Sequence, residues 1–139
     1  MSEVPLLRLH LLRAAYLLIA AGLAATIWPG LLGGPSEWPV MNSVVTAMLA
    51  SLSLIAALGL RYPLKMLPIL LFELGWKAIW LVAVALPLWT RGELEGQAAQ
   101  TAMDCLVGAI LIPLIPWRYV VRTYFVAAGD RWRPDREAQ

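Results

Sequence analysis

Residues 64–89 read LKMLPILLFELGWKAIWLVAVALPLW and form an apolar run long enough to cross a lipid bilayer. A membrane-spanning helix needs about 20 mostly apolar residues. Pro63 disfavours helical backbone at the preceding Tyr62, so the run begins as a separate helix after a tight turn. The sequence therefore predicts a transmembrane helix here, although two charged residues, Glu73 and Lys77, lie deep within the run.

Three further apolar runs of similar length occur, at about residues 9–28, 39–60 and 98–117. The chain has 139 residues, of which 60% are hydrophobic and only 14% are charged, which is too apolar for an ordinary soluble domain. Short connections make consecutive helices antiparallel neighbours. The prediction is an all-α integral membrane protein, a single domain over residues 1–139 that forms an antiparallel four-helix bundle.

The first run also has features of a cleavable signal peptide. Arg8 and Arg13 precede its apolar core, and Gly22 and Ala24 are small residues of the kind that cleavage sites use. The apolar stretch nevertheless continues to Trp28, where Pro29 is expected to end the helix. We therefore expect a retained membrane anchor.

The distribution of Lys and Arg predicts the orientation, because cytoplasmic loops of membrane proteins are enriched in both residues. Nine basic residues fall on one side of the four spans, and only Arg91 falls on the other. The nine are Arg8, Arg13, Arg61, Lys65, Arg118, Arg122, Arg131, Arg133 and Arg136. Both termini are thus expected in the cytoplasm, with segments 29–38 and 90–97 outside it.

The segment after the fourth run is expected to extend that helix along or beyond the membrane surface. Its sequence, RYVVRTYFVAAG at residues 118–129, ends in Gly129, a typical helix stop. Residues 130–139 are polar and are expected to form a mobile tail.

Three charged residues lie deep within the predicted spans, away from their ends. Glu73 and Lys77 are four residues apart, so they share one face of a helix, in the favourable order for an ion pair. At about 1.5 Å per residue they lie roughly 13 and 19 Å into the membrane, and Asp104 of the fourth run lies roughly 20 Å deep. Such residues rarely face lipid. We therefore predict a buried cluster of Glu73, Lys77 and Asp104.

Aromatic and polar side chains are expected to surround this cluster. Trp76 and Trp80 share a face of the third run with the charged pair, and they are expected to wall it. On the second run three polar residues share one helical face at neighbouring depths and offer further partners: Asn42, Thr46 and Ser53. The cluster then either joins the helices structurally or binds a substrate or a proton.

Residue counts exclude several kinds of chemistry. His10 is the only histidine, so a haem held by two histidines is impossible, and Cys105 is the only cysteine. The sequence contains no HExxH, GxSxG or phosphate-binding glycine loop. A net charge of +2 gives no indication of nucleic acid binding. No catalytic residue, metal site or cofactor is predicted.

The four-span layout and the ALGLRYP turn at residues 57–63 resemble small four-helix bacterial inner-membrane proteins, including the DoxX-like group. The resemblance implies a bacterial cytoplasmic membrane location and carries no residue roles. Small multidrug resistance transporters also have four short helices, but their membrane glutamate belongs to the first helix. Here the acidic residue, Glu73, lies in the third.

Two functional hypotheses follow. The first is a non-enzymatic membrane protein, either an accessory subunit or a protein that binds a small molecule or lipid at the buried cluster. The alternative is a small oligomeric transporter in which Glu73 or Asp104 exchanges a proton with the substrate. The expected partners are membrane lipid and either further copies of the chain or a larger membrane complex.

Overall fold

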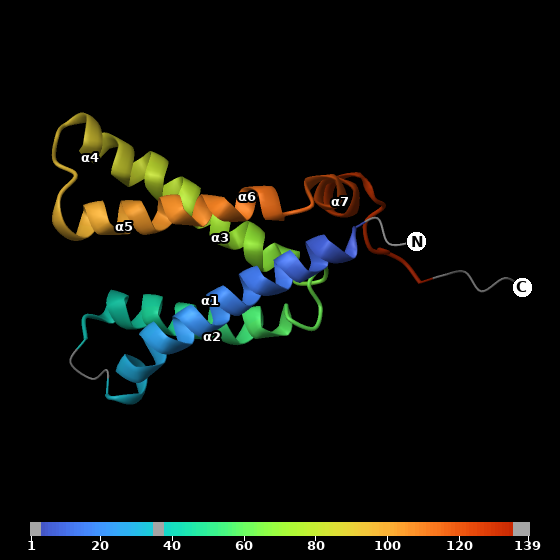
Figure 1. Ribbon diagram of the computed structural model, residues 1–139, viewed down its shortest axis with the longest axis horizontal. Coiled ribbons are helices and arrows are strands. Elements are labelled where there is room, and N and C mark those ends of the chain that lie inside the picture. The colour runs from blue at the N-terminus through green and yellow to red at the C-terminus, as the bar shows by residue number, and fades with distance from the viewer. Residues whose placement is uncertain (1–3, 35–37, 135–139) are drawn as a thin grey trace, which may run out of the picture.

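The computed structural model describes residues 4–34 and 38–134. Over these residues the structure is helical and contains no strand. Figure 1 shows the order of the elements along the chain. They are α1 (Leu6–Leu32), α2 (Val40–Leu58), α3 (Leu67–Trp80), the π-helical turn η1 (Leu81–Ala85), α4 (Leu86–Thr90), α5 (Gly96–Val107), the 3₁₀ turn η2 (Gly108–Ile110), α6 (Leu111–Leu114), α7 (Trp117–Val120) and the π-helical segment η3 (Val121–Val126).

Four helical stretches are long and apolar enough to cross a membrane, which confirms the prediction of four long apolar helices. They are Leu6–Leu32, Val40–Leu58, Leu67–Thr90 and Gly96–Leu114. Only 11% to 22% of the residues in the apolar part of each stretch are buried within the chain. Most of the apolar surface therefore needs cover from outside the chain.

The first helix does not end at Pro29, contrary to the prediction. Proline removes one backbone donor but keeps a helical φ, and the amide of Gly33 still donates to the carbonyl of Pro29 at 3.1 Å. The helix therefore continues for one more turn, to Leu32.

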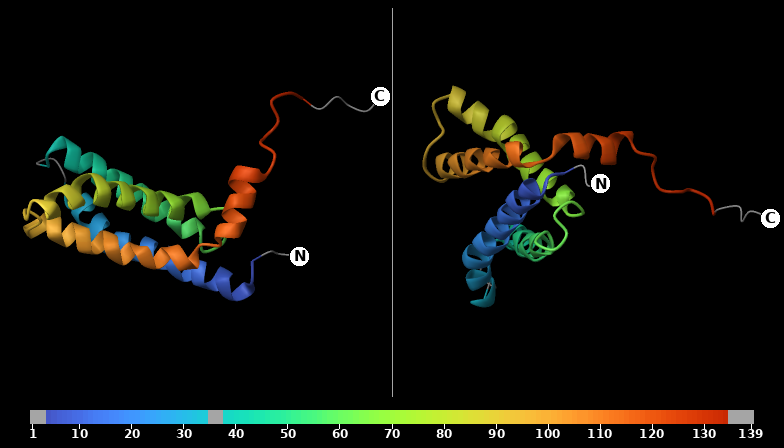
Figure 2. Two further views of the ribbon diagram at one scale, coloured as in Figure 1. Left: turned by 90° about the horizontal axis from the view of Figure 1, so that it is seen from above. Right: turned by 45° about the vertical axis from the view of Figure 1, so that its right-hand side comes forward.

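The four long helices form two hairpins that converge at one end and diverge at the other (Figure 1). One hairpin consists of α1 and α2, and the other of α3 to α4 running against α5 to α6. The N-terminus, the turn between α2 and α3, and α7 lie at the converging end (Figures 1 and 2). The connections that carry Arg91 and Trp38 lie at the diverging end.

The hydrophobic core lies at the converging end, where every span contributes to it. Tyr16 of α1 is fully buried, and it packs with residues from the ends of the other spans. The core cluster comprises Leu12, Ala15, Tyr16, Ala56, Leu67, Leu70, Leu111, Ile115 and Val120.

Tyr16 also fixes the turn between the hairpins. Its hydroxyl donates to the carbonyl of Pro63 at 2.8 Å, and a β-carbon at Gly59 would overlap its ring. One turn earlier on α1, Arg13 Nε donates to the carbonyl of Leu60 at 3.0 Å. The turn therefore packs closely against α1, and glycine at residue 59 provides the space.

The fourth span breaks after Leu114 instead of continuing into the next helix. Ile115 precedes Pro116 and has an extended backbone, with ψ at 128°. Pro116 cannot donate to the carbonyl of Ile112, and the indole N–H of Trp117 donates to it instead, at 2.7 Å. The prediction of a continuous extension to Gly129 was wrong, because helical structure resumes only at Trp117 and ends at Val126.

The predicted mobile tail lies partly outside the described residues. Residues 130–134 contain no helix or strand. Residues 135–139 are outside the described part of the chain, so the expectation of mobility stays a prediction.

Candidate functional site

Helix α3 brings Glu73 and Lys77 into the predicted pair. Lys77 Nζ lies 2.5 Å from Glu73 Oε2, and the exposed fractions of the two side chains are 18% and 5% respectively. The spacing of four residues explains the contact, because it places both side chains on one helical face. The ion pair thus forms within α3 alone and does not depend on contacts with any other helix.

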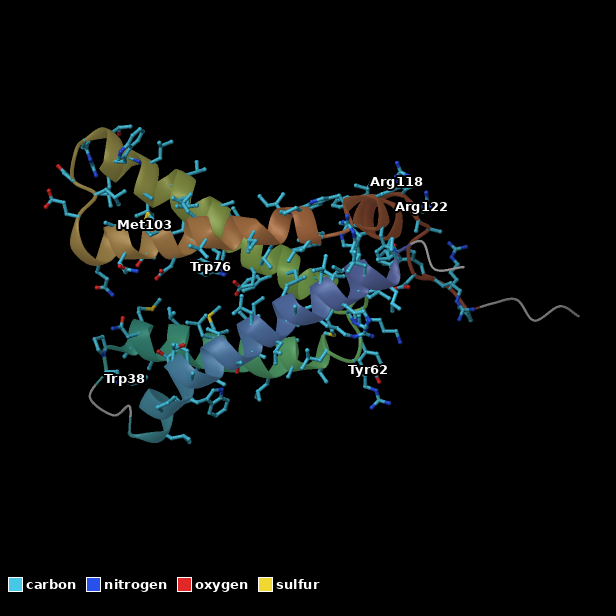
Figure 3. All side chains as sticks on the ribbon, in the orientation of Figure 1. Trp38, Tyr62, Trp76, Met103, Arg118 and Arg122 are labelled. Atoms are coloured by element: carbon cyan, nitrogen blue, oxygen red, sulfur yellow. The ribbon has the colours of Figure 1, made fainter. Side chains whose placement is uncertain are left out.

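Trp76 lies beside the pair on the same helix. Its indole N–H makes a long contact of 3.5 Å with the other carboxylate oxygen, Glu73 Oε1. Lys77 Nζ lies 5.5 Å from the centroid of the Trp76 ring system, within cation–π range. The carboxylate thus has one neighbouring donor at each oxygen. Figure 3 labels Trp76 at the centre of the molecule.

Gly108 of the fourth span makes room for the lysine side chain. A β-carbon at residue 108 would lie 2.9 Å from Lys77 Cδ and 3.2 Å from Nζ. The lysine side chain therefore extends from α3 to η2 of the fourth helical stretch. The sequence analysis missed this residue, although Gly108 is one helical turn beyond Asp104 and so shares its face.

Asp104 does not join the ion pair. Its carboxylate accepts a hydrogen bond from Gln100 Nε2 at 3.2 Å, and the residue is exposed. No ion pair between Asp104 and Lys77 is found in the described part of the chain. The structure thus has one compensated pair and one separate carboxylate in place of a closed triad.

All three ionisable residues nevertheless line one cavity of about 510 Å³ between the two hairpins. Helix α1 forms much of the opposite wall. The lining residues are Ala15, Leu18, Ile19, Gly22, Leu23, Thr26, Leu49, Glu73, Trp76, Lys77, Asp104, Val107, Gly108, Ile110 and Leu111. Trp80, which was expected beside Trp76, is half-buried and does not line it.

The contribution of α1 was not foreseen from the sequence. Gly22 and Thr26 lie one turn apart on the cavity wall, and the Thr26 hydroxyl donates to the Gly22 carbonyl at 2.8 Å. Gly22 has no side chain to fill the space, and the Thr26 hydroxyl is already hydrogen-bonded within α1, so this wall of the cavity is open and only weakly polar. Nothing in an apolar run of alanine, leucine and glycine marks such residues in advance.

The polar residues of the second span have other roles. Ser53 is buried, donates to the carbonyl of Ala50 at 2.6 Å and accepts from the indole of Trp28 at 3.0 Å. Thr46 donates to the carbonyl of Asn42 at 2.8 Å. Ser53 thus joins α2 to α1, and the Thr46 hydroxyl is hydrogen-bonded within α2. None of the three residues lines the cavity.

A second, smaller cavity of about 250 Å³ adjoins the first. Its walls are apolar, and Leu49 and Trp76 line both cavities. Its lining residues are Val45, Met48, Leu49, Leu52, Phe72 and Trp76. An apolar compartment therefore lies directly behind the tryptophan that flanks the ion pair.

The charges that line the cavity can support either recognition of a charged ligand or exchange of a proton. Lys77 compensates Glu73, which leaves Asp104 as the uncompensated ionisable group of the cavity. Within residues 4–34 and 38–134, no three His, Cys, Asp or Glu side chains gather as metal ligands.

Comparison with protein-family models, with curated proteins and with solved structures finds no match to this chain.

Proposed function

We propose that this chain is a multi-pass protein of the bacterial cytoplasmic membrane, with both termini in the cytoplasm. The four long apolar helices support membrane insertion. The positive-inside rule supports the orientation, because the converging end includes the basic turn around Arg61 and the helix with Arg118. In this setting lipid covers the apolar helix surfaces, and the hairpins form a loosely packed bundle.

The protein acts, in this proposal, without catalysis and binds an amphiphilic cation between its hairpins. The observation that carries the proposal is the 510 Å³ cavity, which falls within the range of about 300–1,000 Å³ typical of small-molecule sites. Its ion pair is internally neutral, so the Asp104 carboxylate sets its net charge. A cation is therefore the favoured charged group, and the Trp76 ring offers it a second attraction.

The apolar compartment behind Trp76 supports an amphiphilic ligand rather than a simple ion. Its lining side chains are apolar, so it suits a hydrocarbon group attached to the cation. The cavity also favours a binding protein over an accessory subunit, since a purely structural cluster would close around its charges.

Binding of octyltrimethylammonium to the protein in nanodiscs of zwitterionic lipid tests this proposal. Calorimetric titration should show saturable binding of this cation and none of octyl sulfonate, which has the same chain and the opposite charge. Asp104→Asn should weaken binding tenfold or more, because opposite charges about 4 Å apart attract by about 4 kcal/mol at an effective dielectric constant of 20.

The matched control is Glu93→Gln, which removes an exposed carboxylate at residue 93 in the connection between α4 and α5. It changes the net charge equally and should leave binding unaltered. Equal affinity for the cation and the sulfonate, or full affinity in Asp104→Asn, would rule out a cation site at this carboxylate.

A small oligomeric proton-coupled transporter is the second candidate. The exposure of Asp104 to the cavity favours it, because a carboxylate outside any ion pair can exchange a proton with a substrate. Four helices enclose little volume, so such a transporter needs a second copy of the chain. Proton-coupled uptake into liposomes should disappear in Asp104→Asn and Glu73→Gln, and unchanged flux in both would eliminate transport by this route.

A further inference from the structure

The segment after the fourth span changes direction sharply. Residues 117–126 of α7 and η3 run across the long axis of the hairpins rather than along it (Figure 2). If the hairpins span a bilayer as proposed, this segment lies along the cytoplasmic boundary of the membrane. Its exposed Phe125 and Val126 suit such a position, since apolar side chains of an interfacial helix insert among lipids.

Two arginines of this segment lie on one face. Arg118 and Arg122 are four residues apart, are exposed, and extend to the same side of α7 in Figure 3. Together with apolar residues they line a groove of about 460 Å³: Trp117, Arg118, Val121, Arg122 and Val126. The groove thus combines guanidinium groups with hydrocarbon surface.

Arg118 also lines a second groove, of about 250 Å³, where α7 meets the start of α1. Arg8 contributes a further guanidinium there, and its Nη1 is held by the carbonyls of Ile115 at 3.2 Å and Pro113 at 3.4 Å. The remaining lining residues are Val4, Pro5, Pro116, Trp117 and Tyr119. No acidic side chain of the described chain lines either groove.

From this arrangement we infer that the face of α7 around Arg118 binds the headgroup phosphate of an anionic phospholipid. Guanidinium groups bind phosphate through paired hydrogen bonds. Val121 and Val126 provide apolar surface for the adjoining acyl chain, and Trp117 suits the boundary between lipid and water. The inference rests on the proposed membrane topology and is independent of the ligand in the cavity between the hairpins.

The test is mass spectrometry of the intact protein, released from nanodiscs that contain equal amounts of phosphatidylglycerol and phosphatidylcholine. The wild type should retain phosphatidylglycerol several-fold more often than phosphatidylcholine. Arg118→Gln/Arg122→Gln should reduce this preference to near one. Arg91→Gln, which removes an exposed arginine at the opposite end, should retain it.

Two further measurements distinguish lipid binding from a folding defect and from binding of a small anion. Arg118→Lys/Arg122→Lys preserves the charge and should keep part of the preference even if the glutamine variant does not fold. In the wild type, inorganic phosphate at the concentration of the lipid phosphorus should not displace phosphatidylglycerol. Full displacement would indicate a small-anion site and contradict the lipid assignment, as would an unchanged preference in a folded glutamine variant.

Discussion

The pair of Glu73 and Lys77 illustrates what a local contact contributes within an apolar helix. Each charge alone would be costly at mid-span, roughly 2.5–3.5 kcal/mol on insertion scales. Their contact at 2.5 Å lets both remain inside one helix without a partner from another element. The pair therefore places polar groups at the cavity wall while Asp104 is free to set the charge there.

Removing one member of the pair should destabilise the protein more than removing both. Lys77→Met should lower the free energy of unfolding by about 3 kcal/mol, because it leaves the buried Glu73 carboxylate without its cation. Glu73→Gln/Lys77→Met should recover most of this loss. Unfolding by denaturing detergent, followed by circular dichroism, gives both values.

Disruption of an exposed pair provides the comparison. Arg91→Gln breaks the contact of 3.5 Å between Arg91 Nε and Glu93, whose side chains are about 60% exposed, and should cost less than about 1 kcal/mol. Lys77→Met as stable as the wild type would mean that Glu73 does not depend on its lysine.

Gly59→Ala should be among the most damaging small substitutions in the chain. Its β-carbon would overlap the buried ring of Tyr16, so the turn or α1 must move, at a cost of about 1–3 kcal/mol. Gly75→Ala is the matched control, since no atom lies within 4 Å of the added carbon and alanine favours helix. Equal thermal stability of the two variants in detergent would show that the turn tolerates a side chain.

At the scale of elements, the sequence predicted the features that depend only on residues close to one another along the chain. The four spans follow from apolar runs, and the Glu73 and Lys77 pair follows from helical spacing. The separation of Asp104 from Lys77 depends on how the fourth span is rotated against α3, which no local pattern specifies. The same holds for Gly108, whose importance appears only once the lysine side chain crosses it.

The breaks in the helices were also only partly predictable. Pro29 and Pro116 are both prolines near the ends of apolar runs, yet α1 continues through the first and the fourth span stops before the second. At Pro116 an indole replaces the missing donor, so the Ile112 carbonyl still has a hydrogen-bond partner. The outcome depends on which partners the surrounding structure offers.

Pro116→Ala should straighten the junction between α6 and α7. It restores the missing amide and releases Ile115 from its extended backbone. Spin labels at Thr90→Cys and Phe125→Cys, in a Cys105→Ser background, should move apart by about 10 Å, given a rise of 1.5 Å for each added helical residue.

Pro134→Ala, a substitution beyond the helical segment, should leave this distance unchanged. An unchanged distance in Pro116→Ala as well would show that packing of the buried Val120, and not the proline, orients α7.

At the scale of the whole molecule, one end is packed and the other is open. The core joins all four spans at the converging end, whereas the cavity lies between hairpins that diverge from it. If the cavity binds a ligand as proposed, this division would let the cavity walls adjust to the ligand while the core keeps the hairpins together. A fully packed bundle of the same length would leave no comparable volume.

The orientation of the whole chain can be measured by labelling single cysteines with a membrane-impermeant maleimide in spheroplasts. The proposed topology places the basic side in the cytoplasm. In a Cys105→Ser background, Glu93→Cys should then react in intact spheroplasts, and Lys65→Cys only after permeabilisation. The reverse pattern would invert the topology, and reaction of both residues in intact spheroplasts would contradict insertion of the third span.

The contacts that fix Tyr16 and Arg13 have a consequence for biogenesis. Their partners, Gly59, Leu60 and Pro63, all precede the first ionisable residue of the third span. Once residue 63 has left the ribosome, the nascent chain contains every residue that makes these contacts. The first hairpin can therefore close before Glu73 leaves the ribosome. The third span would then enter the membrane next to an already assembled hairpin, so its charged residues would not first be exposed to lipid on all sides.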